Sequence, residues 1–262
     1  KSEDGTRLSN ILESKGVYPG IKVDKGAHPM DDSPSEKITK GLDGLYERCI
    51  DFYKLGARFA KWRAVITIGD KIPTDNCIQA NASALAKYAK ACQDANLVPI
   101  VEPEVLMDGN HTIQTCYEVS EKTLRTTFNE LEKEGVYLPG ILLKPNMVIS
   151  GKECPVQADM NEGAQMTVKC LMASVPKEVP GIVFLSGGQS ETEATEHLNA
   201  MNAMGEYPWK LSFSYGRALQ QSALRSWAGD NANLDTTYAT FYHRAEMNSK
   251  ACHGEYSPEL EI

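Results

Sequence analysis

The chain has 262 residues, of which 42% are hydrophobic and 24% are charged, and its formal net charge is −8. Disordered chains contain fewer large apolar residues, and a membrane-spanning helix needs about 20 consecutive apolar residues, so the sequence fits neither class. The acidic balance argues against a general nucleic-acid binder, although a local basic pocket remains compatible with it. The length suits one (β/α)8 barrel of roughly 250 residues or two smaller domains.

Six short apolar runs, rich in Val, Ile, Leu or Phe, predict strands. They cover residues 20–23, 58–66, 97–101, 140–143, 181–185 and 211–213. Their apolar residues are nearly continuous, which is typical of parallel strands covered by helices. No GxGxxG fingerprint follows a strand, which disfavours a dinucleotide-binding sheet.

The stretches between these runs have helical periodicity. Apolar positions repeat at helical spacing over residues 42–55, 78–92 and 119–131, and further helices are predicted over 160–173, 191–204, 217–227 and 234–248. Ser190 and Glu193 have the spacing of a capping box, which marks the start of the helix over 191–204. Successive strands recur at intervals of about 40 residues, close to one βα unit of a barrel.

No linker or low-complexity segment divides the chain, so we expect a single domain over residues 1–262. A (β/α)8 barrel needs eight strands, whereas six are found. The sequence therefore predicts either an N-terminally incomplete barrel or a fold that is not a barrel.

The seven cysteines are widely spaced and form no CxxC pair. This pattern favours a reduced, cytoplasmic protein over a disulfide framework or a zinc ribbon. The polar start shows no signal peptide. The five histidines are scattered along the chain, so we expect structural or surface roles for them and no metal site. The three tryptophans are expected to pack in the core rather than to stack on a sugar.

Charged residues stand at the carboxyl ends of four consecutive predicted strands, the ends that face the active site in a barrel. They are Lys22, Lys61, Arg63, Glu102, Glu104 and Lys144. Because strand side chains alternate, Lys61 and Arg63 share one face, and so do Glu102 and Glu104. One such charge is as readily a solvated loop residue. The same habit in four strands favours a site.

Lys144 ends a fully apolar run, where desolvation disfavours the charged form of its amine. A nearby second cation, for which Lys61 is the candidate, would act in the same direction. A neutral amine can attack a carbonyl group to form a Schiff base. Glu102 and Glu104 could then transfer protons, if one of them is held protonated by the other.

The last two predicted strands run into small-residue loops that lead into helices. The first loop contains Ser186, Gly187 and Gly188, and the second contains Ser214, Gly216 and Arg217. Barrels often bind phosphate after strands 7 and 8, where backbone N–H groups and a helix N-terminus meet the anion. Arg217 could bind phosphate with two parallel hydrogen bonds. If these are strands 7 and 8, the chain holds strands 3–8 and lacks strands 1 and 2.

Six motifs, in this order, resemble class I fructose-1,6-bisphosphate aldolase. They are GIKVDKG at 20–26, FAKWR at 59–63, VEPE at 101–104, LKPNM at 143–147, LSGGQS at 185–190 and FSYGRA at 213–218. The stretch over 41–48 is also similar, and the likeness runs from about residue 4 to about residue 256.

The resemblance implies a (β/α)8 barrel that cleaves fructose 1,6-bisphosphate reversibly, in glycolysis and gluconeogenesis, to dihydroxyacetone phosphate and glyceraldehyde 3-phosphate. It implies a cytoplasmic homotetramer with no metal or other cofactor, and with sugar phosphates rather than nucleic acid or membrane as partners. It further implies a Schiff base on Lys144, with Glu102 as general acid and base and with Glu104 and Lys61 as electrostatic partners.

The resemblance also implies two phosphate sites. Ser186, Gly187, Gly188, Gly216 and Arg217 match the site for the C1 phosphate, with Ser214 beside them as a further phosphate-binding candidate. Lys22 and Arg63 match groups on the C6-phosphate side.

Two departures from the family pattern stand out. The aspartate that takes the proton of the C4 hydroxyl has no counterpart here, and the terminal tyrosine of the mobile tail is replaced by an end at Glu261 and Ile262. We hypothesise that the sequence lacks an N-terminal segment of the natural protein. An intact mass near 28.8 kDa for the native, active enzyme would refute this.

Three alternatives stay open on the residues alone. They are another Schiff-base barrel lyase, a metal-dependent aldolase, and a sugar-phosphate-binding or scaffold protein in which catalysis is secondary.

Overall fold

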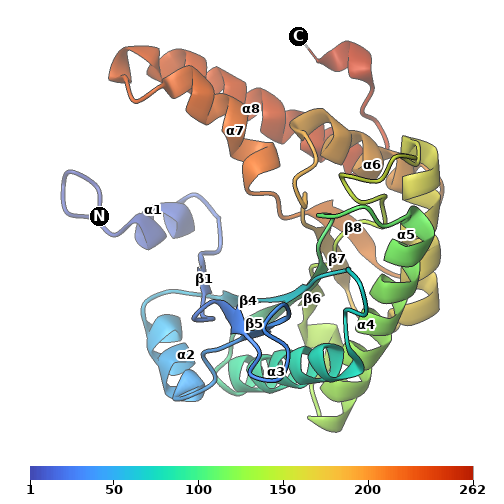
Figure 1. The fold of residues 1–262 in the computed structure, drawn as a ribbon. Helices are drawn as coiled ribbons and strands as arrows, with labels where there is room; N and C mark the ends of the chain where they lie inside the picture. Colours follow the sequence, from blue (N-terminus) through green and yellow to red (C-terminus); the bar gives the residue numbers. More distant parts are fainter. Residues whose placement is uncertain (262) are drawn as a thin grey trace. The chain divides into compact units, whose positions relative to one another are not determined.

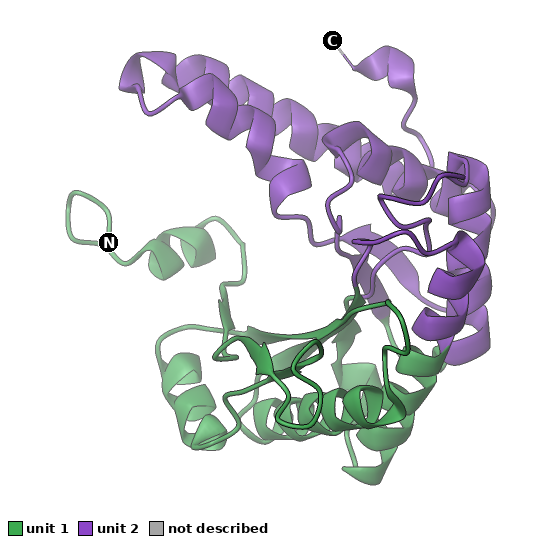
Figure 2. Ribbon diagram, viewed as in Figure 1, with its two compact units in different colours: residues 1–105, 122–144, 175–180 green, residues 106–121, 145–174, 181–262 purple. Residues whose placement is uncertain are grey.

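The computed structural model describes residues 1–261, which divide into two compact units (Figure 2). Unit 1 comprises residues 1–105, 122–144 and 175–180. Unit 2 comprises residues 106–121, 145–174 and 181 onward. The expectation of a single domain stays a prediction.

Unit 1 is built on a parallel sheet whose strands lie in the order β1, β4, β5 and β6 (Figure 1). Their bounds are Gly20–Lys22, Phe59–Ile66, Val98–Val105 and Leu142–Leu143. Three helices belong to this unit, namely α1 (Leu8–Ser14), α2 (Leu45–Lys54) and α3 (Asp75–Asp94), and a short 3-10 turn covers Leu138–Gly140. The four strands predicted for this part of the chain are therefore confirmed.

The prediction ended the third strand too early, at residue 101. In the structure β5 continues to Val105, so that Glu102 and Glu104 lie within the ladder, opposite Arg63 and Val65 of β4. The prediction assumed that two carboxylates so close together lie in solvent, beyond the end of a strand. In the structure both are buried, because each forms an ion pair with a cation of unit 1.

The other face of β4 forms part of the core of unit 1. Trp62 is fully buried and stacks on Tyr88 of α3, with ring centroids 5.5 Å apart. The Tyr88 hydroxyl donates to the carbonyl oxygens of Ala60 (2.7 Å) and Ile100 (3.1 Å). Burial raises the pKa of Tyr88 well above its usual value, which keeps this hydroxyl protonated as a donor. One side chain of α3 thereby ties β4 to β5.

A short antiparallel hairpin, β2 (Ala27–Pro29) and β3 (Lys37–Thr39), follows β1. The sequence analysis did not predict it, because each strand has only three residues and shows no apolar alternation. The Thr39 hydroxyl donates to the carbonyl oxygen of Arg63 (2.6 Å), and the buried Glu36 carboxylate accepts from the N–H and the hydroxyl of Thr74 (2.7 Å each). These contacts fasten the hairpin to β4 and to the start of α3.

Unit 2 contains two parallel strands, β7 (Gly181–Phe184) and β8 (Lys210–Phe213), in register from Gly181 with Lys210 to Phe184 with Phe213. Its helices are α5 (Met160–Ser174), α6 (Glu191–Ala203), α7 (Arg217–Trp227) and α8 (Leu234–Ala251), with 3-10 turns at Asn231–Asn233 and Pro258–Leu260. The predicted bounds agree to within one residue, except that α8 extends three residues further. The capping box of Ser190 and Glu193 is confirmed.

The remaining helix, α4 (Ile113–Lys133), contributes residues to both units. It begins six residues before the predicted periodic stretch, and its first turn adds Ile113 and the buried Cys116, three residues apart, which the prediction did not include. Within residues 1–261, no helix is long and apolar enough to cross a membrane.

Replacing Tyr88 by Phe removes the hydroxyl that joins β4 to β5. We expect Tyr88→Phe to lower the free energy of unfolding by about 1 kcal/mol, as is usual for a buried hydrogen bond. Chemical denaturation followed by circular dichroism measures this change. Tyr46→Phe, at an exposed tyrosine of α2, is the matched control and should change stability little. Equal effects of the two substitutions would contradict the assignment.

Stability should also depend on Glu36. Burial raises the pKa of this carboxyl, but the hydrogen bonds from Thr74 outweigh that effect and hold the pKa below the usual 4.5. A lowered pKa contributes stability that is present above about pH 4.5 and is lost as the pH falls. The difference in unfolding free energy between wild type and Glu36→Gln should therefore shrink below that pH. A constant difference from pH 7 to pH 3 would refute this.

Candidate active site

Three titratable side chains of the unit 1 sheet form one cluster. The Nζ of Lys61 lies 2.8 Å from Oε2 of Glu102, and the Nζ of Lys144 lies 3.2 Å from Oε1 of the same carboxylate. The side chains of Glu102 and Lys144 are only 4% and 12% exposed. A buried carboxylate thus stands between two ammonium groups, and the expected proximity of Lys61 to Lys144 is realised through it.

The backbone of each strand fixes this cluster. Lys61 alternates with the buried Trp62, so its side chain leaves the opposite face of β4. The N–H of Lys144 donates to the carbonyl oxygen of Val101 (2.7 Å), which continues the β5–β6 ladder one residue beyond β6. Lys144 therefore starts from a backbone held in sheet register.

A second ion pair lies further along the same strands. The Arg63 guanidinium contacts the Glu104 carboxylate, whose side chain is 7% exposed, whereas the Arg63 side chain is 43% exposed. The hydrogen bond that Arg63 donates to the Glu104 carboxylate raises the pKa of Arg63, and the charges of Glu102 and Asp24 add to that effect. Each of the two carboxylates of β5 thus contacts a cation.

Lys22 stands apart from the Lys61 cluster and contacts Asp24, with 2.5 Å between Nζ and Oδ1. Asp24 is buried and also accepts from the backbone N–H of Gly26 and of Arg63. The sequence analysis passed over Asp24 as one of several charges at a strand end. The sequence does indicate this residue, because Asp24 lies two positions after Lys22 and so shares its face if the strand continues.

In unit 2, the two predicted loops connect strand to helix as expected. Gly187 and Gly188 have φ of +60° and +100°, and the loop leads directly into α6. After β8, the N–H of Ser214 donates to the carbonyl oxygen of Phe184 (2.9 Å), and α7 begins at Arg217. Gly216 precedes α7 and provides no side-chain cap. The first N–H groups of α7 are therefore free of a capping side chain.

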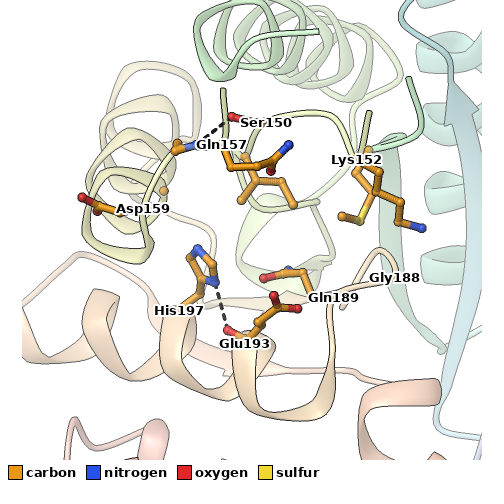
Figure 3. Close-up of a pocket in the computed structure, with 12 residues that line it drawn as sticks. Ser150, Lys152, Gln157, Asp159, Gly188, Gln189, Glu193 and His197 are labelled. Atoms are coloured by element: carbon orange, nitrogen blue, oxygen red, sulfur yellow. Dashed lines mark hydrogen bonds between the residues drawn. The ribbon is translucent and has the colours of Figure 1, made fainter. Parts of the chain in front are cut away.

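A cavity of about 260 Å³ lies beside Gly188 in unit 2 (Figure 3). Gln189, Lys152 and His197 are among its lining residues, none of which the sequence analysis selected. The Oε1 of Gln189 is buried without a hydrogen-bond partner, and burial lowers the pKa of His197 despite its hydrogen bond to the Glu193 carbonyl. A methyl group added to Gly188 would lie 2.6 Å from the Nζ of Lys152, so this lysine packs closely on the glycine loop.

The tryptophans and histidines offer little other chemistry. Trp62 and Trp209 are buried, as expected for core residues, and Trp227 is 38% exposed. Among residues 1–261, no group of three or more His, Cys, Asp or Glu side chains is arranged to hold a metal ion.

The unit 1 cluster defines a class of site: a nearly buried lysine amine beside a buried carboxylate, carried by neighbouring segments of a parallel sheet. The family model described as "Glycolytic: Fructose-bisphosphate aldolase class-I" matches residues 1–261.

Relatives with this activity in their names cover nearly the whole chain. A probable fructose-bisphosphate aldolase class 1 of Xanthomonas axonopodis pv. citri is 53% identical over 98% of this chain and 77% of its own length. Fructose-bisphosphate aldolase of Dictyostelium discoideum is 49% identical over 99% of this chain and 73% of its own length.

A solved structure of the Plasmodium falciparum aldolase, in complex with TRAP and a small-molecule inhibitor, superimposes with a TM-score of 0.96. It is 49% identical and covers 98% of this chain and 75% of that chain. The superposition confirms the predicted barrel-type α/β fold with six of its parallel strands.

The chain belongs to the class I fructose-bisphosphate aldolase family. Its activity is the reversible aldol cleavage of fructose 1,6-bisphosphate to dihydroxyacetone phosphate and glyceraldehyde 3-phosphate through a lysine Schiff base.

Proposed function

We propose that Lys144 is the lysine that forms the Schiff base in this chain. The observation that carries the proposal is the 3.2 Å contact between the Lys144 amine and Glu102, both nearly buried. An amine becomes a nucleophile by giving up a proton, and a carboxylate at this distance can accept one. The other lysine of the cluster, Lys61, is nearly twice as exposed, at 22%.

Glu102 is proposed as the general acid and base for the steps at the substrate C2 carbon. The Lys144 nitrogen attacks the C2 carbonyl, and the oxygen takes up a proton to give a carbinolamine. Loss of the hydroxyl as water, with a proton delivered by Glu102, leaves the iminium. The Oε1 of Glu102 lies 3.2 Å from the Lys144 nitrogen, close enough to exchange protons at the reacting centre.

The iminium on Lys144 then acts as the electron sink. The electrons of the C3–C4 bond move to the iminium nitrogen as an enamine forms, while the C4 hydroxyl gives its proton to a water molecule and becomes the aldehyde of glyceraldehyde 3-phosphate. Protonation of the enamine at C3 and hydrolysis release dihydroxyacetone phosphate. Lys61 holds the Glu102 carboxylate in place by its charge during these steps.

For the C6 phosphate, we propose Lys22 and Arg63. Both side chains combine exposure with a buried acidic partner: Lys22 is 55% exposed beside Asp24, and Arg63 is 43% exposed beside Glu104. Glu104 is therefore proposed to orient the Arg63 guanidinium. An oriented guanidinium can bind phosphate with two parallel hydrogen bonds.

For the C1 phosphate, we propose the two loops of unit 2. The binding groups are Ser186, Gly187, Gly188, Ser214, Gly216 and Arg217. Support comes from the positive φ of Gly187 and Gly188, and from the start of α7 that no side chain caps. Free N–H groups at a helix N-terminus attract anions.

We further propose that the enzyme acts in the cytoplasm as a homotetramer, in glycolysis and gluconeogenesis, and without a metal or organic cofactor. Family membership supports the pathway and the metal-independent Schiff-base chemistry. The seven cysteines are all free thiols in the structure, as suits a reducing compartment.

Borohydride trapping tests the role of Lys144. Reduction in the presence of fructose 1,6-bisphosphate should attach a three-carbon phosphate to Lys144, which peptide mass spectrometry locates. Lys144→Met should abolish the adduct and lower kcat by at least about a thousand-fold, as expected for loss of a covalent nucleophile. Lys90→Met, at a partly exposed lysine of α3 that pairs with Asp94, is the matched control.

Trapping on another lysine would refute this assignment. Trapping on Lys144 only with a different keto substrate would instead favour another Schiff-base lyase. Substrate binding without measurable turnover by the intact protein would favour a sugar-phosphate-binding role.

Gly188→Ala tests the phosphate loop of unit 2. Its φ of +100° strains any residue with a Cβ by about 1–2 kcal/mol, so the loop should shift and the KM for fructose 1,6-bisphosphate should rise several-fold. Gly229→Ala has the same backbone strain, with φ of +78°, and lies between α7 and α8 outside the loop. It should lower Tm without changing KM. A KM that is unchanged in Gly188→Ala would contradict the proposed site.

A further inference from the structure

Asp24 is the most completely bonded acidic side chain beside the proposed C6-phosphate groups. Its side chain is only 2% exposed. Oδ1 accepts from Lys22 Nζ (2.5 Å) and from the N–H of Gly26 (3.0 Å), and Oδ2 accepts from the N–H of Arg63 (3.3 Å). The backbone oxygen of Asp24 also accepts from Lys22 Nζ (3.0 Å).

A buried carboxylate is costly unless donors surround it, and here the chain supplies them on both oxygens. The turn after Asp24 contributes one, since Gly26, with φ of +91°, directs its N–H to Oδ1. The main chain and the Lys22 side chain around Asp24 thus satisfy its buried carboxylate.

The effect on Lys22 is to restrict a long side chain that is otherwise exposed. A lysine that moves freely loses rotamer entropy when it binds an anion. Two oxygens of Asp24 already hold the ammonium in place. An ammonium has three N–H donors, so one remains for a ligand.

Asp24 also acts on the second cation of the pair. Its Oδ2 is bonded to the backbone of Arg63, at the residue whose guanidinium Glu104 holds. One buried carboxylate therefore fixes the position of the Lys22 ammonium and that of the main chain of Arg63.

We propose that Asp24 is a positioning residue that aligns Lys22 and Arg63 for the C6 phosphate and so determines the preference for bisphosphorylated over C1-monophosphorylated substrate. This inference rests on the proposed role of Lys22 and Arg63. A substrate without a C6 phosphate does not use that alignment, and its turnover does not depend on Asp24.

The test compares fructose 1,6-bisphosphate with fructose 1-phosphate as substrates of Asp24→Asn. The asparagine keeps the volume but loses the charge and one acceptor oxygen. We expect kcat/KM for the bisphosphate to fall about ten-fold, mainly through KM, as for loss of a charge-assisted contact. For fructose 1-phosphate, kcat/KM should change by less than about two-fold.

Glu36→Gln is the matched control. The Glu36 carboxylate of unit 1 is also buried and accepts two hydrogen bonds, but its partner is Thr74 and not Lys22 or Arg63. It should lower Tm and leave the ratio of the two kcat/KM values unchanged. Equal losses on both substrates in Asp24→Asn would show a merely structural role and overturn the proposal.

Lys22→Met tests the C6-phosphate role of Lys22 separately from the positioning role of Asp24. If it leaves the substrate ratio of wild type unchanged, the proposed C6-phosphate role of Lys22 is wrong. If it lowers the ratio while Asp24→Asn does not, only the role of Asp24 is wrong. If both lower it, the double variant should be little worse than Lys22→Met, because the two residues act on the same phosphate contact.

A measurement on the wild type covers the case in which Asp24→Asn does not fold. Brief labelling with acetic anhydride, quantified by peptide mass spectrometry, reports how freely each amine reacts. Lys22 should be labelled several-fold more slowly than Lys25, an exposed lysine three residues further along. Equal labelling would show that Asp24 does not restrain Lys22, and would overturn the proposal.

Discussion

The geometry of the unit 1 site depends on the burial of one carboxylate. Glu102 is removed from water in the middle of β5, where an unpaired charge would cost several kcal/mol. Two lysines from neighbouring segments of the sheet offset that cost, and each is thereby drawn toward the same point. The requirement to neutralise Glu102 thus brings together an amine and a carboxylate, the pair that we propose for the Schiff-base chemistry. The contacts that neutralise Glu102 are therefore also the contacts that set the arrangement proposed for catalysis.

Packing on the opposite face of the sheet holds the strands that carry these side chains in register. Trp62 fills the core directly behind Lys61, and Tyr88 bridges the carbonyl oxygens of β4 and β5. A shift of one strand by a single residue would turn Trp62 toward solvent and Lys61 toward the core. The apolar side therefore fixes the register on which the charged side relies, and stability and function of this sheet are coupled through β4.

The sequence predicted the strands and helices well, because continuous apolar runs and helical repeats are local properties. It also predicted which face Lys61 and Arg63 share, since alternation is a rule of the strand itself. Besides α1 and the residues that line the unit 2 cavity, three features escaped it. The β2–β3 hairpin is too short to carry a pattern, β5 runs through two carboxylates that only their partners make compatible with burial, and Asp24 is distinguished by contacts with residues distant along the chain. Roles of individual residues came from family resemblance and remain proposals. Physical reasoning alone reached as far as an amine beside a carboxylate.

The main chain of Arg63 shows how a ladder can end without an unpaired group. After Lys22, the Val23 N–H still donates to the Lys61 carbonyl oxygen of β4. Past that point the Arg63 N–H donates to the Asp24 carboxylate, and the Arg63 carbonyl oxygen accepts from the Thr39 hydroxyl. Two side chains thus replace the main-chain partners that an additional strand residue would supply. At Arg63, β4 therefore has neither an unpaired N–H nor an unpaired carbonyl oxygen. Where side chains take up the main-chain groups at the end of a ladder, those groups are no longer available for pairing with another chain.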